Sequence, residues 1–525
     1  MRVLLITGLL AEENVRKYAQ ESGIDTEVLA LNVPVAAFLT AELIAEALRE
    51  KNLDDFTEIL VPGLVRGDVK LVSEVGGRDT FKGPRYAADL PTVLESLGRV
   101  ELSTIAPACD LLKEELQQKA LLELEAVEKN RIALLKNPGN MLIEELAVGK
   151  DFPMRIMAEI VDAPLLTDVE MEKLARKYVG FGAQIIDVGM IAGESRPMDA
   201  ARAVRAVKRV VNVPVSIDTL NPDEAREAVS AGADLVLSVD AGNIEKMASF
   251  SKNVVVVVIP TNQSTGYFPG KVEERVAFLE ETIARAKKLG MKKIIGDLVL
   301  EPSNVLRSMT AFREYAHRNP ETPLFVGISN FTEMIDADSV GVNALLARLA
   351  SEAGISILLA TERSDKAKGS IREVATASKM MFLAKKRDSV PKDLGLDLLV
   401  FKDKRFREVP YDRQNELGTQ VVIAEEESKP VLCDEEGSFK IAIDRETKEI
   451  VAISFRSSKT LKPRIIVKGK TARAVYTKIT EMGLVTRLDH SAYLGNELAK
   501  AEIAMKTGKE YIQDTSLFKS SLLGY

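Results

Sequence analysis

The sequence predicts an α/β protein with a central (β/α)8 TIM barrel, a parallel α/β domain before it and an α+β domain after it. Between residues 151 and 390, short runs rich in Ile and Val recur, each ending in polar or turn-forming residues and separated by helix-length segments. Parallel strands buried on both faces have this pattern. At 525 residues, the chain is long enough for about three domains.

The N-terminal domain is predicted to span residues 1–108. Strand patterns at 2–7, 26–31 and 57–63 alternate with helical segments, which indicates a small parallel sheet. Gly8 and Gly63 end two of these strands and are candidates for ligand contact. The G-x-G-x-x-G and G-x-x-x-x-G-K-[ST] patterns are absent, so no nucleotide site is predicted. The loop that carries Lys82 and Arg85 is either an anion site or an ordinary polar surface loop.

Residues 109–150 are predicted to be a helical linker, because leucines and alanines recur at helical spacing until the NPGN turn at 137–140. The barrel follows over residues 151–390, with eight strand patterns in about the length of a typical (β/α)8 barrel. Residues 395–525 are assigned to the α+β domain. Its strand patterns lie at 396–403, 417–424, 439–456 and 464–469, and two helical stretches follow.

Composition excludes several classes of protein. The net charge of −7 and the pI near 5.5 give no basis for a nucleic-acid partner. Cys109 and Cys433 are too far apart in sequence to suggest a disulfide framework or a zinc knuckle. The longest apolar runs are much shorter than the roughly 20 residues that cross a bilayer. We therefore expect a cytoplasmic protein without a membrane partner.

Three motifs in the barrel region place carboxylates at strand ends. GAQIIDVG carries Asp187, PVSIDT carries Asp218, and IIGDLVLEP carries Asp297. Chemistry in such barrels takes place at the carboxyl ends of the strands, so these side chains are predicted to share one mouth. An aspartate that only caps the following helix is the structural alternative for each.

IDVG, GESRP and SIDT, in this order and spacing, resemble the pterin-binding barrels, namely dihydropteroate synthases and methyltetrahydrofolate corrinoid methyltransferases. The chain is similar to an archaeal-type, dihydropteroate synthase-related protein with features of the methyltransferases. The resemblance covers roughly residues 153–387. It implies a reduced pterin of the tetrahydrofolate or tetrahydromethanopterin type as cofactor.

The resemblance also implies roles for individual residues. Asp218 and Asp297 match the aspartates that hold the pterin, and Asp297 would accept hydrogen bonds from the adjacent N3–H and 2-amino donors. Asn330 in GISN matches the methyltransferase asparagine beside N5, where the synthases carry a lysine. At the end of the fourth strand the relatives have an asparagine. Here Leu237 or Ser238 stands in its place, with Asp240 and Asn243 just beyond.

Other positions match less closely. AEIVD resembles the methyltransferase motif G-E-x-x-N, with Asp162 in place of the asparagine. Ser195 and Arg196 lie where the synthases contact aminobenzoate, and Arg196 is either a carboxylate ligand or an ordinary loop arginine. Arg363 is either an anion-binding residue or part of a mobile loop. His490, preceded by Asp489 as a candidate N-cap, is either a corrinoid ligand or a structural residue at a helix start.

The resulting hypothesis is a pterin-binding transferase that moves a one-carbon (methyl) group from or to a reduced pterin. Asn330 is the catalytic candidate. The residues expected to contact the substrate are Asp162, Asp187, Ser195, Arg196, Asp218, Ser238, Asp297 and Asn330. Condensation of the dihydropteroate synthase type and a non-catalytic pterin carrier or assembly subunit remain alternatives. We expect a homodimer, no metal, and a corrinoid or corrinoid protein as an optional further cofactor or partner.

Overall fold

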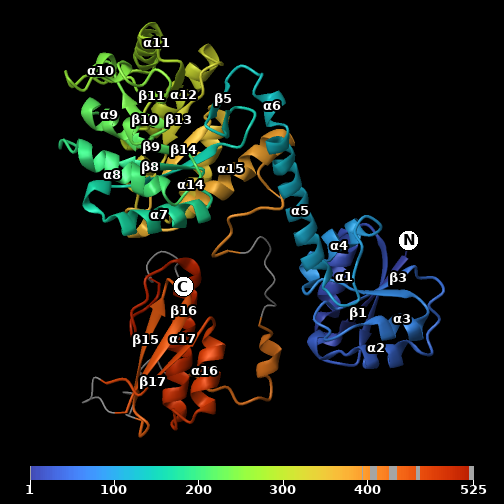
Figure 1. The fold of residues 1–525 in the computed structure, drawn as a ribbon. Coiled ribbons are helices and arrows are strands. Elements are labelled where there is room, and N and C mark those ends of the chain that lie inside the picture. Colours follow the sequence, from blue (N-terminus) through green and yellow to red (C-terminus); the bar gives the residue numbers. More distant parts are fainter. Residues whose placement is uncertain (1, 393, 403–410, 425–433, 457–461, 519–525) are drawn as a thin grey trace. The chain divides into compact units, whose positions relative to one another are not determined.

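The computed structural model describes residues 2–392, 394–402, 411–424, 434–456 and 462–518. The chain forms two compact units, Met1–Glu408 and Val409–Tyr525. The first contains the N-terminal α/β domain and the barrel, and the second contains the C-terminal α+β domain (Figure 1). The predicted fold class is confirmed.

The N-terminal domain is a four-stranded parallel sheet in the order β2-β1-β3-β4. Its helices lie on both faces: α2 and α3 supply one apolar core, and α1 and α4 supply the other. The strands are β1 (Arg2–Gly8), β2 (Asp25–Leu31), β3 (Glu58–Val61) and β4 (Asp79–Lys82). The helices are α1 (Glu12–Glu21), α2 (Ala41–Leu48), α3 (Lys70–Gly76) and α4 (Leu90–Ser96).

The segment between this domain and the barrel contains more than a helix. Asn130 is the C-cap of the long helix α5 (Ala108–Lys129), and the short α6 (Arg131–Leu134) follows. An antiparallel hairpin, β5 (Asn140–Ile143) and β6 (Leu146–Gly149), comes next and was not predicted from the sequence.

Arg155 ties these elements to the first barrel strand. It is buried, donates to Glu128 of α5 at 2.7 and 3.1 Å, and donates to the Ala147 carbonyl of the hairpin at 2.6 Å.

Eight parallel strands form the barrel. Neighbouring strands pair in the order β12-β11-β10-β9-β8-β7-β14-β13, and a bridge between Gly296 and Leu324 joins the ends of this series. The strands are β7 (Arg155–Ile160), β8 (Ile185–Gly189), β9 (Val215–Asp218), β10 (Leu235–Val239), β11 (Val255–Val258), β12 (Lys293–Gly296), β13 (Phe325–Gly327) and β14 (Ile357–Ala360).

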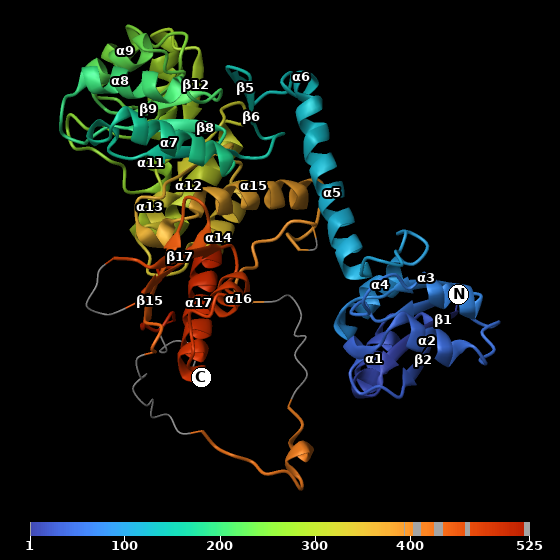
Figure 2. The same ribbon diagram turned by 60° about the horizontal axis from the view of Figure 1, so that its bottom comes forward.

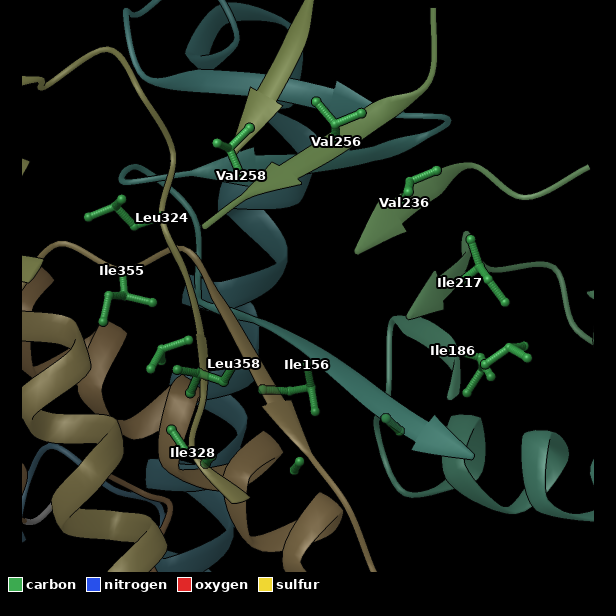
Figure 3. Packing of buried hydrophobic residues seen from close by; sticks show 14 of the residues in the cluster. Ile156, Ile186, Ile217, Val236, Val256, Val258, Leu324, Ile328, Ile355 and Leu358 are labelled. Atoms are coloured by element: carbon green, nitrogen blue, oxygen red, sulfur yellow. The ribbon is translucent and has the colours of Figure 1, made fainter. Parts of the chain in front are cut away.

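Helices follow each barrel strand and bury the outward-facing strand residues. Ile186, Ile217 and Val236 are examples from successive strands (Figure 3). Because side chains alternate along a strand, each of these has a neighbour that faces the interior. The helices are α7 (Asp168–Gly180), α8 (Pro197–Lys208), α9 (Pro222–Ser230), α10 (Ile244–Ala248), α11 (Val272–Lys288), α12 (Val305–Arg318), α13 (Ser329–Thr332), α14 (Ser339–Glu352) and α15 (Ser370–Lys386).

The barrel interior is filled by a separate apolar layer. Met157, Leu235 and Phe325 belong to it, and Ile143 and Val148 of the hairpin pack against the same cluster. The hairpin precedes β7, so it covers the amino ends of the strands. A bound molecule therefore has to approach the interior from the carboxyl ends.

The second unit has an antiparallel sheet in the order β15-β16-β17, with two helices on one face of it (Figure 2). These elements are β15 (Ser438–Asp444), β16 (Glu449–Phe455), β17 (Ile465–Gly469), α16 (Ala472–Glu481) and α17 (Leu488–Thr507). The strands predicted at 396–402 and 417–424 are wrong, because these residues join no sheet. Residue 403 of the first pattern lies outside the described residues. Within the described ranges, no helix is both long and apolar enough to span a membrane.

Candidate functional site at the barrel mouth

Three carboxylates lie together at the carboxyl ends of neighbouring barrel strands. Glu159 comes from β7, Asp187 from β8 and Asp218 from β9, and one oxygen of each lies within 4.8 Å of the others. All three occupy interior-facing strand positions. Two residues earlier on the same strands, Met157 and Ile185 belong to the apolar interior layer. The strand alternation thus places this cluster, hereafter the acid triad, directly above that layer.

Asp187 is the deepest member of the acid triad. It is fully buried, and the Ser216 hydroxyl donates to its Oδ1 atom. Its Oδ2 atom is buried and has no hydrogen-bond partner among the residues that the structure describes. Burial, followed by the charges of Asp218 and Glu159, raises the pKa of Asp187 well above its usual range.

Glu159 is a site residue that the sequence analysis did not single out. Gly189 makes room for it, since a Cβ atom at Gly189 would lie 2.5 Å from Glu159 Oε1. Burial, reinforced by nearby carboxylates led by Asp218, raises the pKa of Glu159 to about 8. The strand pattern could have predicted its orientation. Glu159 stands two residues after Met157, so it faces the barrel interior like Met157.

Asp218 faces both the acid triad and the end of β10. The Ser238 hydroxyl donates to Asp218 Oδ1 at 3.4 Å. Burial raises the pKa of Asp218 to about 6. Ser238 is therefore the β10 residue that contacts a predicted ligand-binding carboxylate, whereas Leu237 belongs to the apolar interior.

Asp240 and Asn243, the other candidates at this strand end, are engaged in holding the loop. Asp240 accepts from the backbone amides of Gly242 and Asn243 at 2.8 and 3.1 Å, and from the Thr261 hydroxyl at 3.0 Å. The Asn243 side chain donates to the carbonyls of Leu220 and Ser238 at 3.2 and 3.1 Å.

Asp297 immediately follows β12. It accepts a hydrogen bond from the Val299 amide at 2.7 Å, and burial raises its pKa to about 7. The loop after it is held by the buried Arg275, whose guanidinium donates to the Leu298 and Val299 carbonyls at 3.5 and 3.4 Å and pairs with Glu301. Asp297 is thus attached to a fixed loop, which suits a residue that must orient a ligand.

Asn330 lies next to this loop, in α13 directly after β13. Its side-chain amide donates to the Leu300 carbonyl at 3.4 Å and lies over Gly327, whose Cβ position would be 3.5 Å from the carboxamide. The residue is exposed, and a hydrogen bond of this length leaves the carboxamide able to exchange partners.

The rim beside β7 and β14 carries an ion pair between Arg363 and Asp162, with a distance of 3.0 Å between Nη2 and Oδ2. Glu333 accepts from the Thr361 hydroxyl and the Ser364 amide, both at 3.0 Å. The charges of Glu333, Asp162 and Arg363 all act on the Glu159 carboxyl, so these residues border the acid triad.

Comparison with known proteins identifies the family. The model described as "Pterin binding enzyme" matches residues 167–364, the PterinBD-DUF4346 model matches residues 433–514, and a family of unknown function matches residues 1–85. An uncharacterized protein of Methanocaldococcus jannaschii is 42% identical over 533 residues, which cover 99% of both chains. This chain belongs to the dihydropteroate synthase-related, pterin-binding family.

Two further matches each cover less than half of this chain. Dihydropteroate synthase of Clostridium beijerinckii is 26% identical over 155 residues, which cover 27% of this chain and 56% of that enzyme. The structure of Thermus thermophilus dihydropteroate synthase in complex with 6HMPPP is 22% identical, with a TM-score of 0.37, and covers 46% of this chain and 97% of that one.

The GESRP loop was a candidate for substrate contact. Its Ser195 and Arg196 side chains bond to neighbouring residues of the barrel. Ser195 is exposed and accepts from the Asn221 side-chain amide at 2.9 Å. The Arg196 guanidinium pairs with Glu194 and, at 3.5 Å, with Asp199. A substrate carboxylate would have to compete with these two acids for Arg196.

His490 has a structural role in the second unit. It is buried, and its Nδ1 atom lies 3.1 Å from Asp434 Oδ2. Asp434 also accepts from the amides of Thr486 and Arg487, both at 3.0 Å, where α17 begins. The expectation that Asp489 is the N-cap is wrong, because Asp489 lies in the first turn of α17 and pairs with Arg487. His490 is 6% exposed, so a corrinoid could reach its ring only if the surrounding side chains moved.

Of the two basic residues considered for an anion site in the N-terminal domain, Lys82 is buried at the end of β4, and Arg85 is held by an ion pair. Arg85 forms a two-pronged ion pair with Asp110 at the start of α5. Gly8 and Gly63 are closely covered by backbone: added Cβ atoms would lie 2.8 Å from the Val33 carbonyl and 2.6 Å from the Gly83 carbonyl. These glycines permit close chain packing, which accounts for both without a ligand.

Proposed function

We propose that this protein binds a reduced pterin of the tetrahydrofolate or tetrahydromethanopterin type at the barrel mouth and transfers a methyl group from or to it. The observation that carries this proposal is the set of interior-facing carboxylates at the strand ends, Asp218 and Asp297 above all. The amino-pyrimidine edge of a pterin presents adjacent N–H donors. Carboxylates, which only accept when ionised, fit such an edge.

Asp297 is proposed to hold this edge of the ring. Its carboxylate is oriented by the Val299 amide, and its loop is fixed by the buried Arg275. Asp218 and the Ser238 hydroxyl would contact the ring from the β9–β10 side, because they already lie 3.4 Å apart at the same end of the barrel. A ligand held from two sides in this way is oriented before the reaction starts.

Asn330 is proposed to act on N5 of the ring. A methyl group on a neutral tertiary amine is a poor electrophile, so N5 must gain a proton or a strong hydrogen bond as the carbon departs. The exposed carboxamide of Asn330 can donate or accept, and its one long hydrogen bond to Leu300 is readily exchanged. An interaction that strengthens only as the methyl group leaves lowers the barrier of the chemical step.

Condensation of the synthase type is the second candidate, supported by the partial match to dihydropteroate synthase. The methyl-transfer proposal is favoured over it because Asn330 stands where the synthases have a lysine, and AEIVD replaces their first-strand diphosphate motif. Purified protein is expected to show little or no condensation of aminobenzoate with the pterin diphosphate in a coupled assay. Robust turnover would put the synthase function first.

The deciding experiment is single-turnover transfer from a methyl-labelled tetrahydropterin to cob(I)alamin, performed beside equilibrium binding of the same pterin. Asn330→Ala is expected to slow transfer about a hundredfold or more, the usual cost of one transition-state hydrogen bond, with a much smaller change in affinity. Asn130→Ala is a suitable control, because Asn130 is an exposed asparagine at the end of α5.

Two outcomes would contradict the proposal. A folded Asn330→Ala protein with weakened pterin binding and undiminished transfer would remove Asn330 from the chemistry. Wild-type protein that binds the methylated pterin and transfers to no corrinoid acceptor would favour a pterin carrier or assembly subunit instead.

A further inference from the structure

Lys82 is a buried lysine of the N-terminal domain that has no part in the pterin site. It is the last residue of β4 and is 4% exposed. Among the residues that the structure describes, none forms a hydrogen bond or an ion pair with its Nζ atom. A buried ammonium without a counter-charge costs free energy, so this position favours a bound anion.

Two charged side chains act on Lys82, and neither neutralises it. Asp68 has the opposite sign, but its carboxylate accepts from the Thr104 side chain and, at 2.9 Å, from the Lys70 amide. Arg85 has the same sign as Lys82 and already pairs with an acid of α5. Burial lowers the pKa of Lys82, and the charge of Asp68 offsets this only in part.

The ammonium remains accessible although the residue is buried. Val61, the strand partner of Lys82, belongs to the apolar core under α2 and α3, so the lysine stem lies on the same face of the sheet. The Nζ atom itself is not fully enclosed. The burial therefore falls mainly on the aliphatic stem, and the charged tip can still meet an anion.

Two segments border the end of β4 on this face. The Lys82 amide donates to the Ser103 carbonyl at 2.9 Å, and the Val69 amide, just before α3, donates to the Thr104 carbonyl at 3.0 Å. Residues 103–104 therefore run between β4 and the start of α3. The next residue, Ile105, is an exposed apolar side chain with 65% exposure.

We propose that Lys82 binds the carboxylate or phosphate group of a small organic anion at the carboxyl end of β4. Ligands of open α/β sheets bind outside the carboxyl ends of the strands, where this ammonium lies. A lysine acts on such groups as a point charge and needs no second prong. Ile105 would contact the apolar part of the molecule. The site belongs to the N-terminal sheet, so it does not depend on pterin binding or methyl transfer.

The test uses full-length protein and two probes, inorganic phosphate and benzoate, at constant ionic strength. Lysines are labelled by reductive methylation with ¹³C-formaldehyde, and peptide mass spectra give the rate at each residue. Only the neutral amine reacts, so a bound anion should slow methylation of Lys82 by about tenfold for each pKa unit that it adds. Lys51, an exposed lysine just after α2, should react at the same rate with and without the probes.

Protection by phosphate alone would assign a phosphate ligand, and protection by benzoate alone would assign a carboxylate. Unchanged methylation of Lys82 with both probes would overturn the proposal. This also holds if phosphate binds elsewhere on the chain, because binding at the barrel would leave the rate at Lys82 unaltered.

Lys82→Met removes the ammonium and keeps an apolar stem, so the fold should be retained. Calorimetric titration with the protecting anion should show affinity at least about tenfold lower than in wild type. Lys51→Met is the matched control and should bind as wild type does. A folded Lys82→Met protein with undiminished affinity would overturn the assignment. If this variant fails to fold, the methylation rates of the wild-type protein decide alone.

Discussion

Asp297→Asn is expected to weaken pterin binding and, at alkaline pH, to stabilise the fold. The substituted amide has nearly the same shape and keeps an oxygen for the Val299 amide, which donates to Asp297 at 2.7 Å. Only the charge and one acceptor are lost. The change in pterin affinity therefore tests the carboxylate as a ligand, and the change in stability tests it as a buried charge.

The stability effect follows from the pKa of Asp297, which burial raises from 3.8 to about 7. Because the folded state holds this proton more tightly than the unfolded state, the carboxyl favours folding most at low pH, and this contribution is lost as pH rises through 7. At about 1.4 kcal/mol per pH unit, the full loss is at most about 4 kcal/mol, a ceiling because the side chain is partly exposed. Asp297→Asn avoids this loss, so it should match wild type near pH 4 and exceed it near pH 9.

Asp297→Asn should weaken pterin binding, although it stabilises the fold at alkaline pH. An asparagine offers one acceptor and one donor to a ring edge that presents two donors, so we expect a loss of about 2 to 4 kcal/mol, or roughly thirty- to a thousandfold. Wild-type affinity should also rise as pH rises through about 7 and the carboxylate forms. Thermal melts at pH 4 and 9 beside equilibrium titration with reduced pterins measure both effects. Unchanged affinity at pH 8 would refute the assignment of Asp297, and an absent alkaline gain in stability would refute its buried-charge role.

The remaining predictions concern structural elements. Ile143→Ala, in the hairpin below the barrel, should cost about 2 to 5 kcal/mol because Ile143 is fully buried, whereas Leu142→Ala, at 38% exposure, should cost little; equal melting temperatures would contradict the packing role. Asp434→Ala should destabilise the second unit by roughly 2 to 4 kcal/mol, because the amides of Thr486 and Arg487 lose their acceptor. Hydrogen bonds hold the pKa of Asp434 below its usual range despite burial. In wild type, the contribution of Asp434 to the free energy of unfolding should therefore be lost in strong acid. Near-ultraviolet dichroism would measure the destabilisation by Asp434→Ala and the loss of stability in acid.

The barrel was predictable because its signal is repeated. Each strand carries its own run of Ile and Val, each is followed by a helix, and the ends of β8, β9 and β12 carry aspartates. Asp187, Asp218 and Asp297 could therefore be assigned to one end of the fold without knowing any contact. The same periodicity implied that Glu159, two residues after Met157, faces the interior. A single glutamate within a strand pattern is a weaker signal than an aspartate that ends one.

Other features depend on contacts that sequence patterns do not contain. The β5–β6 hairpin has only four residues in each strand, and its apolar residues make sense only because Ile143 and Val148 meet the barrel interior. The 417–424 segment has the composition of a strand, yet none of the strands that the structure describes pairs with it. Asp240 and Asn243 were candidate ligands by position, and only their hydrogen bonds show that they hold a loop.

The order of the strands separates the mouth into two parts that can be tested independently. The acid triad comes from β7, β8 and β9, whereas Asp297 and Asn330 follow β12 and β13, on the far side of a closed eight-stranded barrel. Sites without shared contacts behave additively under mutation, and sites joined through a common ligand do not. If the acid triad only shapes the floor of the mouth, the effects of Asp187→Asn and Asn330→Ala on methyl transfer should multiply. If the pterin that Asn330 acts on also contacts the acid triad, the double variant should be much less impaired than that product.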